Sequence, residues 1–439
     1  MTDTKPAAMS NRAVLRLPEF RKLFVAQSIS DLGDGFTFTA LLLLVNALTH
    51  SPLALAVLSI AVALPSMIGG IVAGAVADRR DRRRIMILSD SVRAVLVLGF
   101  VLVGTVERLP ILYAVAFAQA SIGTLFSPAR GAVIPRVVPA EGLMAANGLA
   151  QMSRMIGYVI GTSLAGMIVA TTGQFWPAFV LDAATFAISV LIVTRVDPAV
   201  GRPNAAPSGA PTRGLGGSVV DGLRTIGSSP TLLATIVGLG IAMLGFGAVN
   251  LLFVPFIIND LQESAVWLGP VEAAQSISMI LAAGFVGVIA ARISPKAMVV
   301  GGLLGIGTMI AAMSAAPNII VLLVVVFTAG WFITPAQAAT QTIVMTATAD
   351  HVRGRVIGAF QATMSTTTIV STAAAGILAG VIGIREVFLL GGLVSLGAAG
   401  LTAVLFRMDS GARRVGVAEP AMAEDLADDE EPADQRSAA

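Results

Sequence analysis

Four acidic side chains within long apolar stretches are the groups in this sequence best suited to chemistry. Asp31 and Asp34 lie three positions apart. Asp182 lies in a second apolar run, and Glu272 is followed three positions later by Gln275. A carboxyl group in a low-dielectric setting holds its proton more tightly than in water, and a neighbouring carboxylate strengthens the effect. The pattern therefore favours reversible proton binding. Asp34 is the preferred group because it lies deeper than Asp31, roughly 15 Å or more into its helix at about 1.5 Å per residue.

Asp31 and Asp34 also have a structural interpretation, as ion-pair partners at the inner boundary of their helix. The candidate bases are Arg16, Arg21 and Arg154. A charge in hydrocarbon costs at least about 2.5 kcal/mol, so a buried acid indicates a cavity, a proton site or an ion pair. Asp90 and Arg93, three positions apart, are expected to form such a structural ion pair near the cytoplasmic face.

The other polar residues within apolar runs have two interpretations each. Asp182, roughly 10 Å from the outer end of its helix, is a cavity residue or accepts a hydrogen bond from a neighbouring helix. Glu272 and Gln275 face a cavity together, or Glu272 is shallow enough to meet water. Neutral polar residues that could line the same path or simply join helices are Gln119, Asn250, Gln337 and Gln361.

The stretches that carry these groups are long enough to cross a bilayer. Residues of the types AVILMFWYC make up 56% of the chain and charged residues only 12%, about half the charge of a typical soluble domain. A run of about 20 apolar residues spans the hydrocarbon layer, and it must be a helix because lipid offers no hydrogen-bond partners. Twelve helices are predicted, at 22–48, 52–78, 83–106, 110–134, 142–171, 174–195, 231–258, 265–291, 296–315, 317–346, 353–381 and 385–407.

Basic residues alternate between the connections. The second connection holds five arginines between Asp78 and Ile85, and the other even connections are also basic, whereas the odd ones carry only Arg108 and Arg385. Lysine and arginine remain on the cytoplasmic side of a membrane. The alternation therefore predicts twelve spans with both chain ends in the cytoplasm.

Two related halves are predicted. Gly74-x-x-x-Asp78-Arg79 ends the second helix, and Gly287-x-x-x-Ala291-Arg292 ends the eighth. Repeats of this kind are common in secondary transporters. The predicted fold is all-α and integral to the membrane, with twelve transmembrane helices in two pseudo-symmetric six-helix bundles.

The predicted divisions are a cytoplasmic segment 1–21, a six-helix bundle 22–195, a cytoplasmic linker 196–230, a second bundle 231–407 and a tail 408–439. The linker is rich in glycine, proline and serine and is expected to be flexible. The tail is acidic and lacks aromatic residues, so it is expected to be disordered.

The stretch from Gly74 to Arg84, GAVADRRDRRR, resembles the signature Gly-x-x-x-Asp-Arg-x-Gly-Arg-Arg of the major facilitator superfamily. Asp81 replaces the second glycine, as in the drug and siderophore exporter branch, which includes macrolide efflux proteins. The stretches SISDLGDG, SPARGAVIP, LDAATFAIS and DHVRGR have the same character, and the resemblance covers residues 20–407. One departure is the stretch from Gly161 to Gly166, which lacks the proline found in many proton antiporters of the superfamily, although Gly157, Gly161 and Gly166 still allow close helix contact.

The resemblance implies a secondary-active exporter of amphipathic, drug-like small molecules in the bacterial plasma (inner) membrane, driven by proton antiport with alternating access. It also implies a cytoplasmic gate in which Asp78 contacts Arg130 or the helix start near Val352. The implied gate residues are Gly74, Asp78, Arg79, Arg82, Arg130, Asp350, Arg353 and Arg355. The structural alternative is that the arginines of this loop anchor it to anionic lipid.

Several function classes are disfavoured. The chain has no cysteine, two histidines and no phosphate-binding loop, so we expect no metal, no cofactor and no built-in ATPase. We expect no enzyme and no nucleic-acid partner. The expected partners are a small-molecule substrate, protons and lipids, with the protein as a monomer. The alternatives are an exporter of a native metabolite such as a siderophore or lipid, and a transport-inactive membrane sensor or scaffold.

Overall fold

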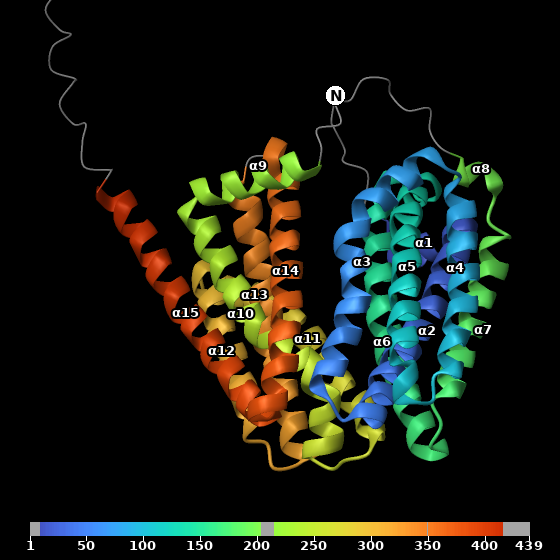
Figure 1. The fold of residues 1–439 in the computed structure, drawn as a ribbon. Helices are drawn as coiled ribbons and strands as arrows, with labels where there is room; N and C mark the ends of the chain where they lie inside the picture. The colour runs from blue at the N-terminus through green and yellow to red at the C-terminus, as the bar shows by residue number, and fades with distance from the viewer. Residues whose placement is uncertain (1–8, 203–214, 349, 416–439) are drawn as a thin grey trace, which may run out of the picture.

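The computed structural model describes residues 9–202, 215–348 and 350–415, with side chains described outside 68–79, 215–221, 350–351 and 409–415. The described residues form helices and connecting turns (Figure 1). The long helices before the linker are α2 (Pro18–Thr49), α3 (Pro52–Arg79), α4 (Arg82–Leu98), α5 (Leu109–Val137), α6 (Leu143–Thr172) and α7 (Trp176–Val193). Those after it are α10 (Pro230–Pro255), α11 (Leu268–Ala290), α12 (Pro295–Ser314), α13 (Ile319–Thr346), α14 (Asp350–Ile382) and α15 (Ile384–Val415).

Eleven helices in the described part are long and apolar enough to cross a membrane. The remaining long helix, α3, contributes a shorter apolar stretch at Pro52–Met67. The chain is therefore an all-helical, multi-pass membrane protein. Most of the predicted helices agree with observed ones to within a few residues. The two largest differences are at 83–106, where α4 ends at Leu98 and a 3₁₀ turn, Gly99–Leu102, follows, and at 385–407, where α15 continues to Val415.

Proline and capping side chains explain where the helices begin. Pro230 and Pro295 occupy the first turns of α10 and α12, where a missing N–H costs nothing. Ser294 Oγ accepts from the Ala297 N–H at 3.3 Å, and Asn318 Oδ1 accepts from the Val321 N–H at 3.0 Å. These caps satisfy donors that have no partner within the helix.

The helices of the two halves pack in equivalent pairs. In the first half α2 contacts α6 and α7, α3 contacts α5, and α4 contacts α5 and α7. In the second half α10 contacts α14 and α15, α11 contacts α13, and α12 contacts α13 and α15. When each helix is replaced by the helix at the same position in the other half, the contacts of the first half become the contacts of the second. The contacts between halves, α3 with α14 and α6 with α11, also exchange under this matching.

The predicted linker 196–230 contains helices α8 (Pro198–Gly201) and α9 (Leu215–Ser228). The α9 helix packs against α14, where Gly222 meets the backbone at Arg355, and Ile226 is buried in the second half's core. The expectation of a flexible linker is thus wrong for 215–228, because α9 has an apolar side to bury. Residues 203–214 lie outside the described residues. Likewise α15 continues to Val415, beyond the predicted start of the tail, and 416–439 are not described.

The molecule has two distinguishable ends. We call the end that carries α8 and α9 the linker end (Figure 1). One buried apolar cluster joins both halves and includes Phe36, Leu251 and Phe388. The clusters around Met86 and around Val356 each belong to a single half. Shared core therefore joins the halves on the side away from the linker end.

Candidate functional site

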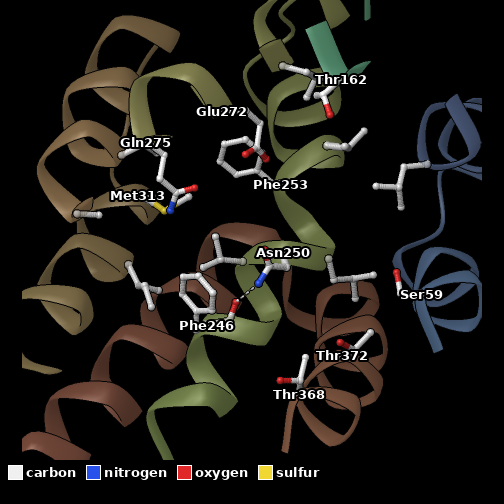
Figure 2. A pocket seen from close by; sticks show the side chains of 18 of the residues that line it. Ser59, Thr162, Phe246, Asn250, Phe253, Glu272, Gln275, Met313, Thr368 and Thr372 are labelled. Atoms are coloured by element: carbon white, nitrogen blue, oxygen red, sulfur yellow. Dashed lines mark hydrogen bonds between the residues drawn. The ribbon is translucent and has the colours of Figure 1, made fainter. Parts of the chain in front are cut away.

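A cavity of about 370 Å³ lies between the two halves. Figure 2 shows side chains from both halves around it, with Thr162 and Ser59 on one side and Phe246, Asn250 and Phe253 on the other. Its volume falls in the range of small-molecule sites. The remaining polar lining residues are Thr39, Tyr158, Glu272, Gln275, Thr368 and Thr372, and the others are apolar. We call it the central cavity.

Helical spacing explains which side chains line the central cavity. Phe246, Asn250 and Phe253 are four and three positions apart on α10, so they share one face. Glu272 and Gln275 share a face of α11 for the same reason and both line the cavity (Figure 2). This is the cavity-facing arrangement considered for them from the sequence. The Asn250 amide donates to the Phe246 carbonyl at 3.4 Å.

A second hollow, of about 520 Å³, lies within the first half, and more of its lining residues are charged. Asp31, Asp34 and Gln119 line it, together with Arg93 and Arg154. The two acids of α2 thus face one space, as their spacing predicts. We call it the polar hollow.

Arg93 joins Asp34, which is partly exposed to the hollow, and Asp90, which is buried. Its guanidinium donates to Asp34 and lies 3.8 Å from Asp90. Ser189 Oγ donates to Asp90 at 2.6 Å, and the Phe186 ring lies 4.2 Å from the guanidinium carbon. The Asp90–Arg93 pair is present as predicted. The base that contacts Asp34 comes from α4 and was not among the arginines considered for it. Of those, Arg154 of α6 lines the same hollow as Asp31 and Asp34 but forms no described ion pair with either.

Asp31 and Asp182 differ in how their oxygens are satisfied. Asp31 accepts from the Gln27 amide at 2.6 Å, and its second oxygen is buried without a hydrogen-bond partner among the described residues. Asp182 is fully buried and accepts from Thr37 at 2.5 Å and from Thr185 at 3.1 Å. Its bond to α2 is the structural alternative considered from the sequence, and Asp182 lines neither the central cavity nor the polar hollow.

Some of the remaining predicted cavity residues line one of the two spaces and others line neither. Gln119 is buried in α5 beside the polar hollow, and Asn250 faces the central cavity. Gln361 is exposed on α14 and lines neither space. Gln337, also considered from the sequence, lines neither space.

The predicted gate is only partly described. Gly74, Asp78, Arg79 and Asp350 belong to helical positions whose side chains lie outside the described set, so the latch stays a prediction. Arg82 is buried at the start of α4, and Arg130 is half-buried in α5.

Neighbouring arginines contact backbone carbonyls. Arg353 donates to the Met345 and Thr348 carbonyls at 3.2 and 3.3 Å, and Arg83 donates to those of Val193 and Thr194. Arginines therefore hold the carbonyl ends of α13 and α7, an arrangement that the helix dipole favours.

Small residues and an amide pair close the end opposite the linker end. Gly376 packs against Ala56, and Gly166 packs against the backbone of Ala265. Close approach of this kind needs a residue without a large side chain. Beside these contacts, Asn46 of α2 and Asn259 of the π-turn Phe256–Asp260 exchange hydrogen bonds.

Two features of the site were not predicted from the sequence. Tyr158, Phe38 and Val62 line both the central cavity and the polar hollow, so they form the layer between them. Tyr158 is one of only two tyrosines in the chain, and a rare polar aromatic residue in an apolar run was a usable signal. The Asn46–Asn259 contact joins residues 213 positions apart, and no local pattern indicates it.

Solved structures define the class of the fold. The nucleoside transporter NupG, in a mutant form, superimposes with a TM-score of 0.72 at 13% identity, covering 88% of this chain and all of that one. A bacterial homologue of the human lysosomal transporter Spinster, inward-facing and unoccupied, gives 0.66 at 15% identity over 90% of this chain and 97% of that one. The fold is that of these membrane transporters.

Sequence comparison gives the family. The family of transmembrane secretion effectors matches residues 9–433, so the chain belongs to this family of the major facilitator superfamily and is a transporter, not an enzyme. It is 28% identical to the multidrug efflux pump Tap of Mycolicibacterium fortuitum, over 81% of this chain and 88% of Tap. It is 26% identical to the enterobactin exporter EntS of Escherichia coli, over 82% of this chain and 85% of EntS.

Proposed function

We propose that this protein exports amphipathic small molecules across the bacterial plasma membrane, by proton antiport with alternating access. The observation that carries the proposal is the central cavity, which both halves line and which has a mostly apolar wall. An adaptable wall of phenylalanine and methionine suits cargo of varied shape. The relatives named as a multidrug efflux pump and a siderophore exporter support the direction.

The framework for this cycle is twelve spans in two six-helix bundles, 22–195 and 231–407. The equivalent helix pairing of the two halves supports it, since repeats of this kind rock about a shared site. With both chain ends in the cytoplasm, as the arginine distribution favours, the seam of Gly376 and Ala56 closes the outer end. The captured state is then inward-facing, ready to load cargo from the cytoplasm.

Proton coupling is assigned to the polar hollow. Asp34 shares Arg93 with Asp90, and Asp31 has an oxygen without a described partner. Protonation of Asp34 would release Arg93 to Asp90 alone and so change the relative stability of the two states, which is how an ion gradient drives a cycle.

Reconstituted liposomes test the proposal. The purified protein, with the liposome interior made acidic, should accumulate the amphipathic dye Hoechst 33342, and nigericin, which collapses the pH gradient, should stop accumulation. Protein-free liposomes are the control. If the dye still accumulates in the presence of nigericin, proton antiport is excluded. If no dye accumulates across a panel of cationic and neutral amphipathic dyes, drug export is excluded.

A siderophore exporter is the second candidate, and the relation to EntS is the observation that favours it. Against an anionic cargo, the described lining of the central cavity contains the acid Glu272 and neither lysine nor arginine. An anionic chelate would therefore meet a carboxyl group and no base.

A further inference from the structure

We infer that Glu272 is a recognition site for organic cations and that the preferred cargo of the central cavity is a monovalent amphipathic cation, such as a quaternary or protonated amine. The inference rests on the proposed function, because it names the chemical class of what the same cavity carries.

Glu272 has no partner of its own in the part of the chain that the structure describes. Among the described residues its carboxyl group has no hydrogen bond and no ion pair. It is the one residue of aspartate, glutamate, lysine or arginine type in the described lining of the central cavity. The acids of the first half are different, since Asp34 and Asp90 share Arg93 and Asp182 accepts from two threonines.

An acid without a partner in an apolar cavity is costly to keep ionised. A bound cation removes that cost by supplying the counter-charge, and it gains a strong electrostatic interaction because little water competes. An anion would add to the cost. The carboxyl group therefore selects cargo by the sign of its charge. The apolar cavity wall does not select for the detailed shape of the apolar part of the cargo.

The residues around Glu272 suit the rest of such a molecule. Phe253 and Phe246 present aromatic rings to the cavity, and Met313 and Gln275 also line it (Figure 2). Aromatic faces attract cations as well as apolar groups. Gln275, one helical turn from Glu272, can exchange hydrogen bonds with an N–H group or a carbonyl of the cargo.

The position of Glu272 separates cargo recognition from proton binding. Glu272 lies on α11 in the second half, whereas Asp31 and Asp34 lie on α2 in the first. The two sets line different spaces, with Tyr158 in the layer between them. A carboxyl group used for cargo charge in one half therefore leaves the acids of the other half available for protons.

Two probes of matched shape and opposite charge test the inference. Tetraphenylphosphonium is a permanent cation and tetraphenylborate a permanent anion, so neither changes its protonation. Binding of each to the purified full chain is measured by calorimetry for wild type, Glu272→Gln and Glu272→Asp. The matched control is Glu263→Gln, the same substitution at a glutamate that does not line the central cavity.

The wild type should bind the cation at least about tenfold more tightly than the anion, a difference that one charge interaction readily supplies. Glu272→Gln should weaken cation binding about tenfold and leave the anion unchanged or tighter, because the substitution removes the charge and keeps the size. Glu272→Asp should keep a clear preference for the cation, and Glu263→Gln should match wild type.

Several results would overturn the inference: a wild type that does not bind the cation, equal binding of the two probes, or a Glu272→Gln protein that binds the cation like wild type. If Glu272→Gln does not fold, loss of the cation preference in Glu272→Asp overturns it instead. Failure here is separable from failure of the proposed function. If the Glu272→Gln protein still exports a neutral dye, the proposed export function stands whatever the result for the cation. If the wild type binds the cation but transports nothing, the export function fails and the cation site stands.

Discussion

Asn46 and Asn259 exchange two side-chain hydrogen bonds across the two halves, at 3.1 and 3.0 Å. Each amide donates to the other's oxygen, so the pair is mutually satisfied and needs no charge. Both residues lie at the end that the two halves close together. A contact of this kind holds a closed end while leaving it able to open, because two such bonds within a membrane protein contribute only about 1–2 kcal/mol.

Cross-linking this pair should arrest transport. Because the natural chain has no cysteine, Asn46→Cys/Asn259→Cys can be made directly in it. A short bis-methanethiosulfonate cross-linker, which forms one disulfide with each cysteine and releases two sulfinate groups, should lower dye transport by at least about tenfold, since the closed end can no longer open and the cycle needs both states. Reduction should restore transport. Each single-cysteine variant treated with the same reagent is the control, and full transport by the cross-linked protein would contradict the role of this contact.

Asp34→Asn should abolish proton exchange and leave the protein folded. The new amide can still accept from Arg93, and Asp90 at 3.8 Å still supplies a counter-charge. The exchange rate, followed with a pH-sensitive dye inside liposomes, should fall by at least about tenfold, which corresponds to about 1.4 kcal/mol of barrier. Asp197→Asn, at the start of α8, is the matched control. Normal exchange by Asp34→Asn would remove Asp34 from the mechanism.

Thr37→Val should destabilise the first half. It removes the hydroxyl that donates to the buried Asp182 at 2.5 Å and leaves that oxygen without its partner, at a cost of about 1–3 kcal/mol. Thermal unfolding in detergent measures the loss. Thr37→Ser keeps the hydroxyl and should behave like wild type. Equal losses in both variants would show that the methyl group, and not the hydrogen bond, is what matters at this position.

Gly161→Ala should be harmful, and Gly148→Ala on the same helix should not. A methyl group at Gly161 would lie 2.9 Å from the Gly35 Cα atom, whereas at Gly148 nothing lies within 4 Å. Overpacking of this kind costs about 1–3 kcal/mol. The two variants can be compared by folded yield and thermal unfolding in detergent. If both retain wild-type stability, α2 and α6 have room to separate and the close contact is not required.

Helix positions could be predicted from the sequence because the residues that begin and end helices act locally. The prediction 142–171 became Leu143–Thr172, where Gly173 adopts a positive φ of 65° that ends the helix. Glycine reaches that conformation without steric cost. The α9 helix was missed because the glycine and serine around it suggest a flexible chain, whereas its stability depends on burying Ile226 against distant helices.

The candidate site was predictable as a set of side chains but not as a set of contacts. The spacing of Asp31 and Asp34 placed both beside one hollow. That Arg93 would contact Asp34 depends on how α7 packs against both α4 and α2, and the two residues lie 59 positions apart. Gln361 shows the converse limit: a polar residue within an apolar run does not reveal which side of its helix faces a cavity.

The layer formed by Phe38, Val62 and Tyr158 has a consequence for how cargo and protons could influence each other. These same three side chains line both spaces, so an occupant of either space contacts residues that the other occupant also contacts. Communication between the two ligands then requires no relay through the length of a helix. Steric contact through these three shared side chains would be enough.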